Sequence, residues 1–205
     1  YFNGNESIKY GIKKITDDFV DDYSTILPIF KTGNLKESKK AHPYMDKAIQ
    51  KGSVVIQKHS IKIRGKEYCR WIDDNYFMVG KAYFYKGEFD EAIKTFVFIS
   101  DEYKKSFISY DALLWLSRCY LEKGDFASSE AILIDLENNR KFPEELEKDY
   151  EIITADLYLR QGNLPLAKSA ILNCLKKHKV GKDKARLNFI LAQIYQLEEQ
   201  YGRAS

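Results

Sequence analysis

Apolar and polar residues follow the period of an α-helix along most of the chain. Apolar residues recur three or four positions apart, which places them on one face of a helix. This pattern predicts helices at 5–19, 44–59, 66–86, 89–104, 108–123, 126–140, 144–161, 164–178 and 182–198. The predicted fold class is all-α, and a β-strand of more than a few residues within 66–205 would contradict the prediction.

Four segments of the chain share one phrase. A small residue is followed by a tyrosine three positions later, then usually by a glycine and a bulky apolar residue. In the first copy these are Gly80, Tyr83, Gly87 and Phe89. The four tyrosines are Tyr83, Tyr120, Tyr158 and Tyr195, so the copies are spaced by 37, 38 and 37 residues. Self-similarity at such a period indicates a repeat architecture.

Each residue type in the phrase has a physical role. The small residue allows two helices to approach closely, and we expect Gly80 and Ala155 to be buried at such contacts. The glycine ends the first helix in a left-handed conformation that other residues adopt only at a cost. Glu199 replaces this glycine in the fourth copy, so a less tightly specified turn is expected there. The next small residue, for example Ala204 in the fourth copy, restores close packing.

The phrase resembles the tetratricopeptide repeat (TPR) over about residues 66–205. The resemblance implies an α-solenoid of antiparallel helix pairs. The usual period is about 34 residues, and the proline that usually closes the second helix is replaced here by Lys104, Lys141 and Lys179. Second helices, or their connections, are therefore expected to be longer by about one turn. The expected repeats are 73–109, 110–147, 148–184 and a truncated 185–205.

Residues 1–65 depart from the repeat and are expected to form an atypical helical cap. Residues 20–43 contain an apolar cluster around Pro28, which disfavours helix for the residue before it. We therefore expect an inserted extended segment that packs across helices. A short connector after His59 should lead into a helix that begins near Lys66.

Composition and charge narrow the possible functions. The chain is 44% hydrophobic and 31% charged, which favours a packed core over disorder. Its net charge is only +3, with lysines and acidic residues interspersed, so a nucleic-acid surface is not expected. No apolar run approaches the length needed to span a bilayer, so the chain itself is expected to be soluble. The pattern starts and stops abruptly at Tyr1 and Ser205, as expected for a piece of a longer protein.

No residue pattern indicates catalysis, a metal or a cofactor. The cysteines are Cys69, Cys119 and Cys174, and the histidines are His42, His59 and His178. The cysteines are odd in number and widely spaced, which favours packed thiols over disulfides or a zinc site. The histidines lie in polar, lysine-rich sequence without metal-ligand spacing. The acidic run 17–22 lacks the alternating oxygen ligands of a calcium loop. We therefore expect no enzyme activity and no cofactor.

The candidate site is the groove that a TPR array forms from its first helices. Its residues stand at the second, fifth, ninth and twelfth positions of each repeat. They are Asp74, Phe77, Lys81 and Phe84; Asp111, Leu114, Arg118 and Leu121; Asp149, Ile152, Asp156 and Leu159; and Arg186, Phe189, Gln193 and Gln196. The fifth position is apolar in all four copies, which predicts an apolar stripe flanked by charges of both signs.

Two interpretations of this stripe remain open. It would suit a helix or an extended peptide of a partner protein. Alternatively, segment 20–43 or further repeats of the same protein cover it. Core packing does not obviously require the fifth-position residues, so replacing Phe77 and Leu114 together by serine is expected to spare the fold.

Several linking phrases carry a closer resemblance. They are the phrases at 1–6 (YFNGNE) and 59–68 (HSIKIRGKEY), which lead into 71–74 (WIDD) and 80–85 (GKAYFY). These phrases resemble the N-terminal region of the SprE/PorW family, TPR-containing lipoproteins of the gliding-motility and type IX secretion machinery of Bacteroidota. The resemblance implies a place on the periplasmic face of the outer membrane. It also implies partners among other envelope subunits of protein export.

The lipidated cysteine expected in that family is not in this sequence, so membrane contact would come only through an anchor outside it. The alternative function is a generic peptide-binding TPR adaptor in another compartment. An enzyme with a helical-repeat fold is a third alternative, but no catalytic constellation supports it.

Overall fold

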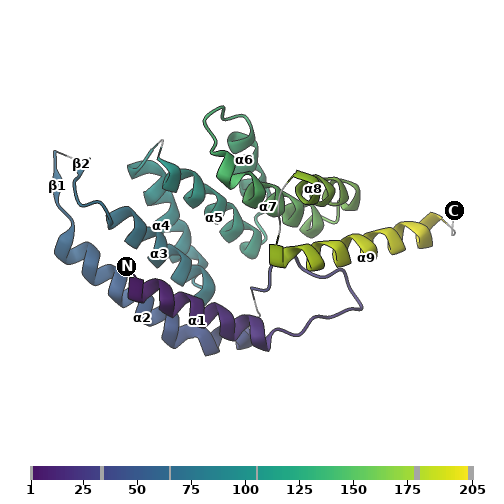
Figure 1. The fold of residues 1–205 in the computed structure, drawn as a ribbon, viewed down its shortest axis with the longest axis horizontal. Helices are drawn as coiled ribbons and strands as arrows, with labels where there is room; N and C mark the ends of the chain where they lie inside the picture. Colours follow the sequence, from purple (N-terminus) through teal and green to yellow (C-terminus); the bar gives the residue numbers. More distant parts are fainter. Residues whose placement is uncertain (1, 33–34, 65, 105, 178–180, 203–205) are drawn as a thin grey trace. The chain divides into compact units, whose positions relative to one another are not determined.

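A computed structural model of the chain describes residues 2–32, 35–64, 66–104, 106–177 and 181–202. Within these ranges the chain is helical apart from connections and two short strands (Figure 1). The elements are α1 (Phe2–Asp18), α2 (Leu35–His59), β1 (Lys62–Ile63), β2 (Lys66–Glu67), α3 (Ile72–Lys86), α4 (Phe89–Glu102), α5 (Phe107–Lys123), α6 (Phe126–Glu137), η1 (Glu144–Leu146), α7 (Glu147–Arg160), α8 (Leu164–Lys177), η2 (Gly181–Asp183) and α9 (Lys184–Gly202). The strands pair antiparallel, with Ile63 opposite Lys66.

The elements form two compact units. Unit 1 comprises Tyr1–Phe19 and Lys31–Gly124, and unit 2 comprises Val20–Phe30 and Asp125–Ser205. In unit 1, α1 packs against α2 and α3, and α3 packs against α4 and α5. In unit 2, α7 packs against α8 and α6, and α8 packs against α9. The expected repeat 110–147 thus contributes α5 to one unit and α6 to the other.

Helix α1 lies within a few residues of its predicted range, but α2 and α3 begin at other residues than predicted. Helix α2 begins at Leu35 rather than at 44, and Pro43 lies inside it. One face of this longer helix buries Ala41, Met45 and Ala48 against α1 and α3. That packing offsets the backbone hydrogen bond that the proline cannot make.

The helix expected to begin near Lys66 instead begins at Ile72, after the β-hairpin. The Glu67 carboxylate accepts hydrogen bonds from the backbone N–H groups of Ile61 and Cys69, at 2.9 and 2.8 Å. These bonds stabilise the hairpin conformation of this region relative to a helical one. Gly65 lies outside the described residues.

The glycines of the repeated phrase adopt the expected left-handed conformation. Gly87, Gly124 and Gly162 have φ values of 82°, 76° and 74°. In the fourth copy, by contrast, α9 continues through Glu199 to Gly202, so the turn expected after 198 is absent there. A helix that lacks a left-handed residue at this position has no local signal to stop.

The small residues of the phrase lie at close helix contacts. Gly80 and Ala155 are both buried, as predicted, and Ala155 is fully inaccessible. The fourth copy differs, because Ala192 is exposed and Tyr195 remains 46% exposed. Ala204, the next small residue of that copy, lies outside the described residues.

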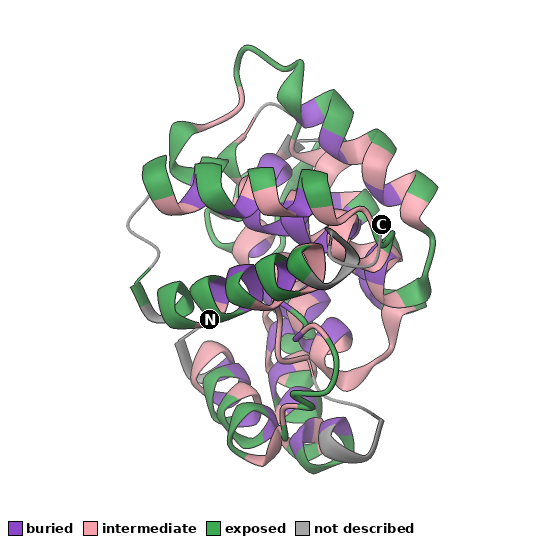
Figure 2. Ribbon diagram, turned by 90° about the vertical axis from the view of Figure 1, so that its right-hand side faces the viewer, coloured by how far each residue is buried: buried purple, intermediate pink, exposed green. Residues whose placement is uncertain are grey.

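The residues that lengthen the repeats lie in connections rather than in second helices. Helix α6 ends at Glu137, and the chain then passes through residues 138–143 and the short helix η1 before α7. Lys141 lies in this connection, Lys104 follows the end of α4, and Lys179 lies outside the described residues. Buried and exposed positions alternate along the helices (Figure 2).

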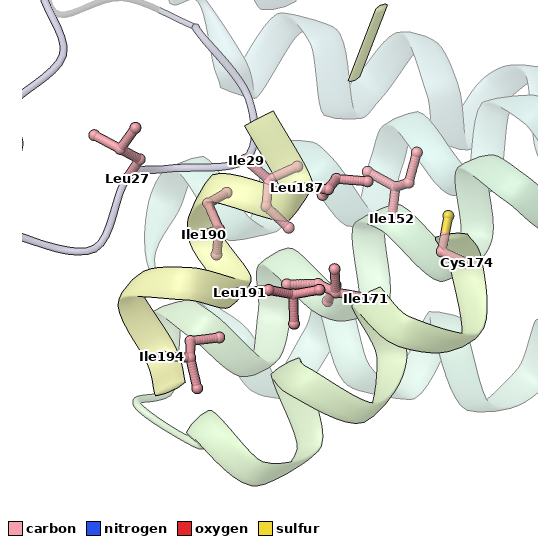
Figure 3. Packing of buried hydrophobic residues seen from close by; sticks show 10 residues of the cluster. Leu27, Ile29, Ile152, Ile171, Cys174, Leu187, Ile190, Leu191 and Ile194 are labelled. Atoms are coloured by element: carbon pink, nitrogen blue, oxygen red, sulfur yellow. The ribbon is translucent and has the colours of Figure 1, made fainter. Parts of the chain in front are cut away.

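The core of unit 2 includes residues from a distant part of the sequence. Leu27 and Ile29 join one hydrophobic cluster with side chains of α7, α8 and α9. Figure 3 shows Ile29 beside Leu187 of α9, with Ile152 of α7 nearby. The extended segment predicted over 20–43 is thus confirmed for residues 20–30, which pack across the helices of unit 2, and wrong for 35–43, which belong to α2.

Candidate protein-binding groove

Half of the candidate groove residues lie in unit 1, on α3 and α5. We call these eight residues the unit-1 stripe: Asp74, Phe77, Lys81 and Phe84 on α3, and Asp111, Leu114, Arg118 and Leu121 on α5. Their spacing of three, four and three residues keeps each set on one helix face. Residues of both helices line one hollow, and the Arg118 guanidinium of α5 lies over the Phe84 ring of α3, so the two faces meet.

The stripe is more deeply packed than its sequence suggested. Leu114 is 1% exposed, and Phe84 and Leu121 are each 2% exposed. The expectation that Phe77 and Leu114 could both become serine without harm to the fold is therefore wrong for Leu114. First helices pack against neighbours on both sides, so an apolar residue at the fifth position of α5 is drawn into the core.

An aromatic cluster forms the middle of the unit-1 stripe. The Trp115 ring meets Phe77 and Phe84 edge-on, with centroid distances of 6.4 and 5.2 Å. Two cations cover the same ring, Lys81 Nζ at 5.0 Å and the Arg118 guanidinium at 4.3 Å from its centroid. These rings hold both cations in place through cation–π attraction.

Trp115 was missed by the sequence reasoning. It stands one residue after the fifth position of its repeat, a place that the TPR frame does not assign to the groove. A large aromatic residue directly beside an assigned position was the signal that could have found it. Its half-buried ring links the two helices of the stripe.

An acidic hollow of about 410 Å³ lies at one end of the stripe. It is lined by three carboxylates and by apolar and small side chains: Asp73, Asp74, Asp111, Phe77, Ser106, Phe107 and Ile108. Phe107 is 52% exposed there. Burial, followed by the adjacent Asp73 carboxylate, raises the pKa of Asp74, against the opposing charge of Arg70. The ionised form of Asp74 is therefore held at a cost in free energy.

The candidate residues on α7 are part of the core of unit 2. Ile152 is 5% exposed and belongs to the hydrophobic cluster, with Leu159 packed against it. Asp156 is 2% exposed, and its carboxylate accepts a hydrogen bond from Arg160 Nε at 2.9 Å. These three residues therefore serve packing, and the expectation of a free apolar row does not hold for Ile152.

The candidate residues on α9 hold the chain's own extended segment. Arg186 donates to both carboxylate oxygens of Asp21, at 2.7 and 3.1 Å, and to the Pro28 carbonyl at 2.7 Å. The Gln193 amide donates to the Thr25 carbonyl at 2.7 Å. Its oxygen accepts from the Leu27 backbone N–H at 3.0 Å.

Aromatic contact completes this docking. The ring of Phe189 meets Tyr23 edge-on, with centroids 5.5 Å apart. Gln196, at the twelfth position, is exposed. Residues 20–30 therefore contact the second, fifth and ninth positions of α9, although the Phe189 ring remains 42% exposed. For α9, this agrees with the interpretation that segment 20–43 covers the stripe.

Unit 2 contains a further hollow of about 490 Å³, which the sequence did not predict. It lies between α6, the 138–146 connection, α7 and α8, and Phe142, Tyr150 and Tyr158 contribute its rings. Burial raises the pKa of Tyr150 to about 12. Charges of both signs line it, and Lys177 is paired with Glu151 at 2.8 Å. The added residues of the connection supply one wall, which explains why the repeat pattern gave no sign of it.

A metal site and a membrane span each place requirements on the residues that the structure describes. No group of three or more His, Cys, Asp or Glu side chains there could hold a metal ion. His59 is exposed, His42 is half-buried, and His178 lies outside the described residues. Among the described helices, none is both long enough and apolar enough to cross a membrane.

Comparisons with known proteins agree with the helical-repeat architecture. The tetratricopeptide repeat family matches residues 77–137, which include most of α3 and all of α4, α5 and α6. No curated protein sequence matches the chain.

Two solved structures share the fold at low sequence identity. A putative kinesin light chain with TPR-like repeats from Podosopora anserina is 11% identical, with a TM-score of 0.54 over 98% of this chain and 89% of that one. BtubC (BKLC) from P. vanneervenii is 13% identical, with a TM-score of 0.61 over 98% of this chain and 84% of that one. The chain is thus an all-α protein with a TPR-like fold that contains tetratricopeptide repeat sequence.

Proposed function

We propose that this protein is a non-catalytic scaffold that binds other proteins through the unit-1 stripe. Proteins built from tetratricopeptide repeats are typically scaffolds of this kind. One observation carries the proposal: the second, fifth and ninth positions of α9 already hold an extended chain, residues 20–30. At the same repeat positions of α3 and α5, Asp74, Phe77 and Asp111 line a hollow, whereas Leu114 is buried.

The finer proposal is a role in type IX protein secretion and gliding motility, at the periplasmic face of the outer membrane. It rests on the phrases at 1–6, 59–68, 71–74 and 80–85, which resemble the SprE/PorW family. The partners would then be other envelope subunits of the secretion machinery. A lipid anchor outside this sequence would hold the protein at the membrane.

Site-specific photo-crosslinking in cells tests both the binding of proteins through the unit-1 stripe and the role in secretion. A photoreactive phenylalanine analogue replaces Phe107, which is 52% exposed and lines the acidic hollow. The matched control places the same analogue at Ile134 of α6, which is 49% exposed and lies outside the candidate groove. We expect defined crosslinks to secretion-system subunits from position 107 only.

The other outcomes separate the alternatives. Crosslinks from position 107 to proteins unrelated to secretion would support the generic adaptor and contradict the secretion role. Equal crosslinking from both positions, or crosslinking only from position 134, would move the interface away from the unit-1 stripe.

A further inference from the structure

The docked segment on α9 shows how three repeat positions divide the recognition of an extended chain. Arg186, at the second position, binds a side-chain carboxylate. Phe189, at the fifth, contacts an aromatic side chain. Gln193, at the ninth, exchanges two hydrogen bonds with the backbone. Arg186 also donates to the Pro28 carbonyl, so its pairing with Asp21 is the part of the contact that depends on the charge of the bound residue.

The second position carries the opposite charge in unit 1. Asp74 stands there on α3 and Asp111 on α5, and both line the acidic hollow together with Asp73. The fifth position of α3 keeps an aromatic residue, Phe77. A chain bound in the same manner would place a basic residue, rather than an acidic one, beside these carboxylates.

The hollow has the chemistry that a lysine or arginine side chain requires. Its carboxylates can pair with the charged group, while Phe77 and Phe107 can cover the aliphatic part and contribute cation–π attraction. Arg70 lies near enough to affect Asp74, but burial and the neighbouring Asp73 outweigh it and the pKa of Asp74 stays raised. An arriving cation would therefore relieve a repulsion that the free protein contains.

We infer that the acidic hollow of unit 1 binds an extended segment of a partner protein through a lysine or arginine side chain. The inference rests on the proposed scaffold function and adds the chemical class of its ligand. Salt screens the attraction between the carboxylates of the hollow and a basic side chain of the partner. The affinity should therefore fall as the salt concentration is raised.

The test uses the full chain and three synthetic peptides. The peptides copy residues 20–30 but carry Arg, Gln or Glu in place of both Asp21 and Asp22. A fluorinated phenylalanine at position 107 reports binding in the hollow by ¹⁹F NMR, so peptide exchange at α9 does not contribute to the signal. We expect the Arg peptide to bind about fivefold or more tightly than the Gln peptide, the scale of one partly exposed ion pair.

Two variants and one control test whether Asp74 binds the basic side chain. Asp74→Asn should remove most of the preference for the Arg peptide. Asp74→Arg gives α3 the residue type that α9 has at this position, and should reverse the preference toward the Glu peptide. Asp149→Asn changes the same repeat position on α7 and should leave all three affinities unchanged.

The inference is overturned if the wild-type chain does not prefer the Arg peptide, if no peptide shifts the signal, or if Asp74→Arg fails to reverse the order. These results are distinguishable from failure of the proposed function. Crosslinks from position 107 to a partner, without a preference for the Arg peptide, would support the scaffold function and contradict only the inference of a basic ligand.

Discussion

A Cβ atom at position 80 would lie 2.7 Å from Cε1 of Phe96, so α3 and α4 meet over Gly80 with no room for even a methyl group. Phe96 is itself fully buried. The first small residue of the repeated phrase is thus a contact point between two helices, and its size is set by the ring that it faces.

Replacing Gly80 by alanine should therefore destabilise unit 1. In an exposed helix this change stabilises by about 1 kcal/mol. Here the added methyl group must displace a buried ring, and overpacking of this kind costs about 1–3 kcal/mol. The free energy of unfolding, measured by urea denaturation and circular dichroism, should fall.

A double-mutant cycle isolates the contact. Phe96→Leu removes the ring edge, so Gly80→Ala should cost less in that background than in the wild type. Equal costs in both backgrounds would mean that the methyl group clashes with something other than Phe96.

The left-handed glycines provide a purely conformational prediction. A Cβ at Gly124 would meet no atom within 4 Å, so Gly124→Ala changes only the backbone energy at φ 76°. We expect a loss of about 1–2 kcal/mol in unfolding free energy. Gly124→Asn should cost less, because asparagine tolerates this conformation better. A smaller loss for alanine than for asparagine would contradict the proposed helix end.

The ion pair between Asp21 and Arg186 should hold the extended segment on α9. The two side chains are only 11% and 14% exposed, so removing one leaves the other charge poorly solvated. Arg186→Ala should lower the unfolding free energy by about 1.5–3 kcal/mol, the range for hydrogen bonds to charged groups.

The exposed pair Lys94–Glu91 is the matched control, with side chains 69% and 49% exposed. Lys94→Ala should change stability by less than about 1 kcal/mol. Faster proteolysis within residues 20–30 of the Arg186→Ala variant alone would locate the effect at the segment. Equal stability losses for the two variants would contradict the docking.

The raised pKa of Asp74 predicts a specific pH dependence. Its cause is burial first and Asp73 second. Because the native state holds this proton more tightly than the unfolded state, the contribution of Asp74 to stability falls as pH rises from the unfolded value, near 3.9, through the higher folded value. Asp74→Asn removes this loss.

Thermal melts across acidic and neutral pH check the sign. The Asp74→Asn protein should melt at a higher temperature than the wild type at neutral pH, and the difference should vanish below about pH 3. A lower melting temperature for Asp74→Asn at neutral pH would mean that its charge is stabilised rather than strained.

The three cysteines should differ in reactivity. Burial raises the pKa of Cys119 to about 12 and that of Cys174 to about 11. The thiolate is the reactive form, so both should resist a thiol reagent at neutral pH in the native protein. Cys69 is only half-buried and should react first. All three should react after denaturation, and rapid native labelling of Cys119 would contradict its burial.

The amino-acid sequence by itself determined the helical class, the repeat phrase and the ends of α3 and α5 before the left-handed glycines Gly87 and Gly124. These features depend on local physics: the spacing of apolar residues, the absence of a Cβ at Gly87 and Gly124, and the small size of Gly80. Each of these features acts within a few residues or between consecutive helices, so it can be predicted from the local sequence.

The sequence could not fix the residues at which α2 and α3 begin. At Pro43 the local signal opposed a helix, and packing of Ala41 and Met45 decided otherwise. At Lys66 the side chain of Glu67 bound backbone groups on both sides of the hairpin. Propensity is weak compared with several tertiary contacts, so local reasoning failed at these two places.

The candidate site was decided still more by tertiary structure. The repeat frame named Leu114 and Phe189 as equivalent, yet one is core and the other meets Tyr23 of a segment far away in the sequence. Which position of a repeated stripe becomes core, which holds the chain's own residues and which lines a hollow depends on neighbours that the repeat does not encode. Burial and charge pairing arise between distant segments, and only the folded chain brings those segments together.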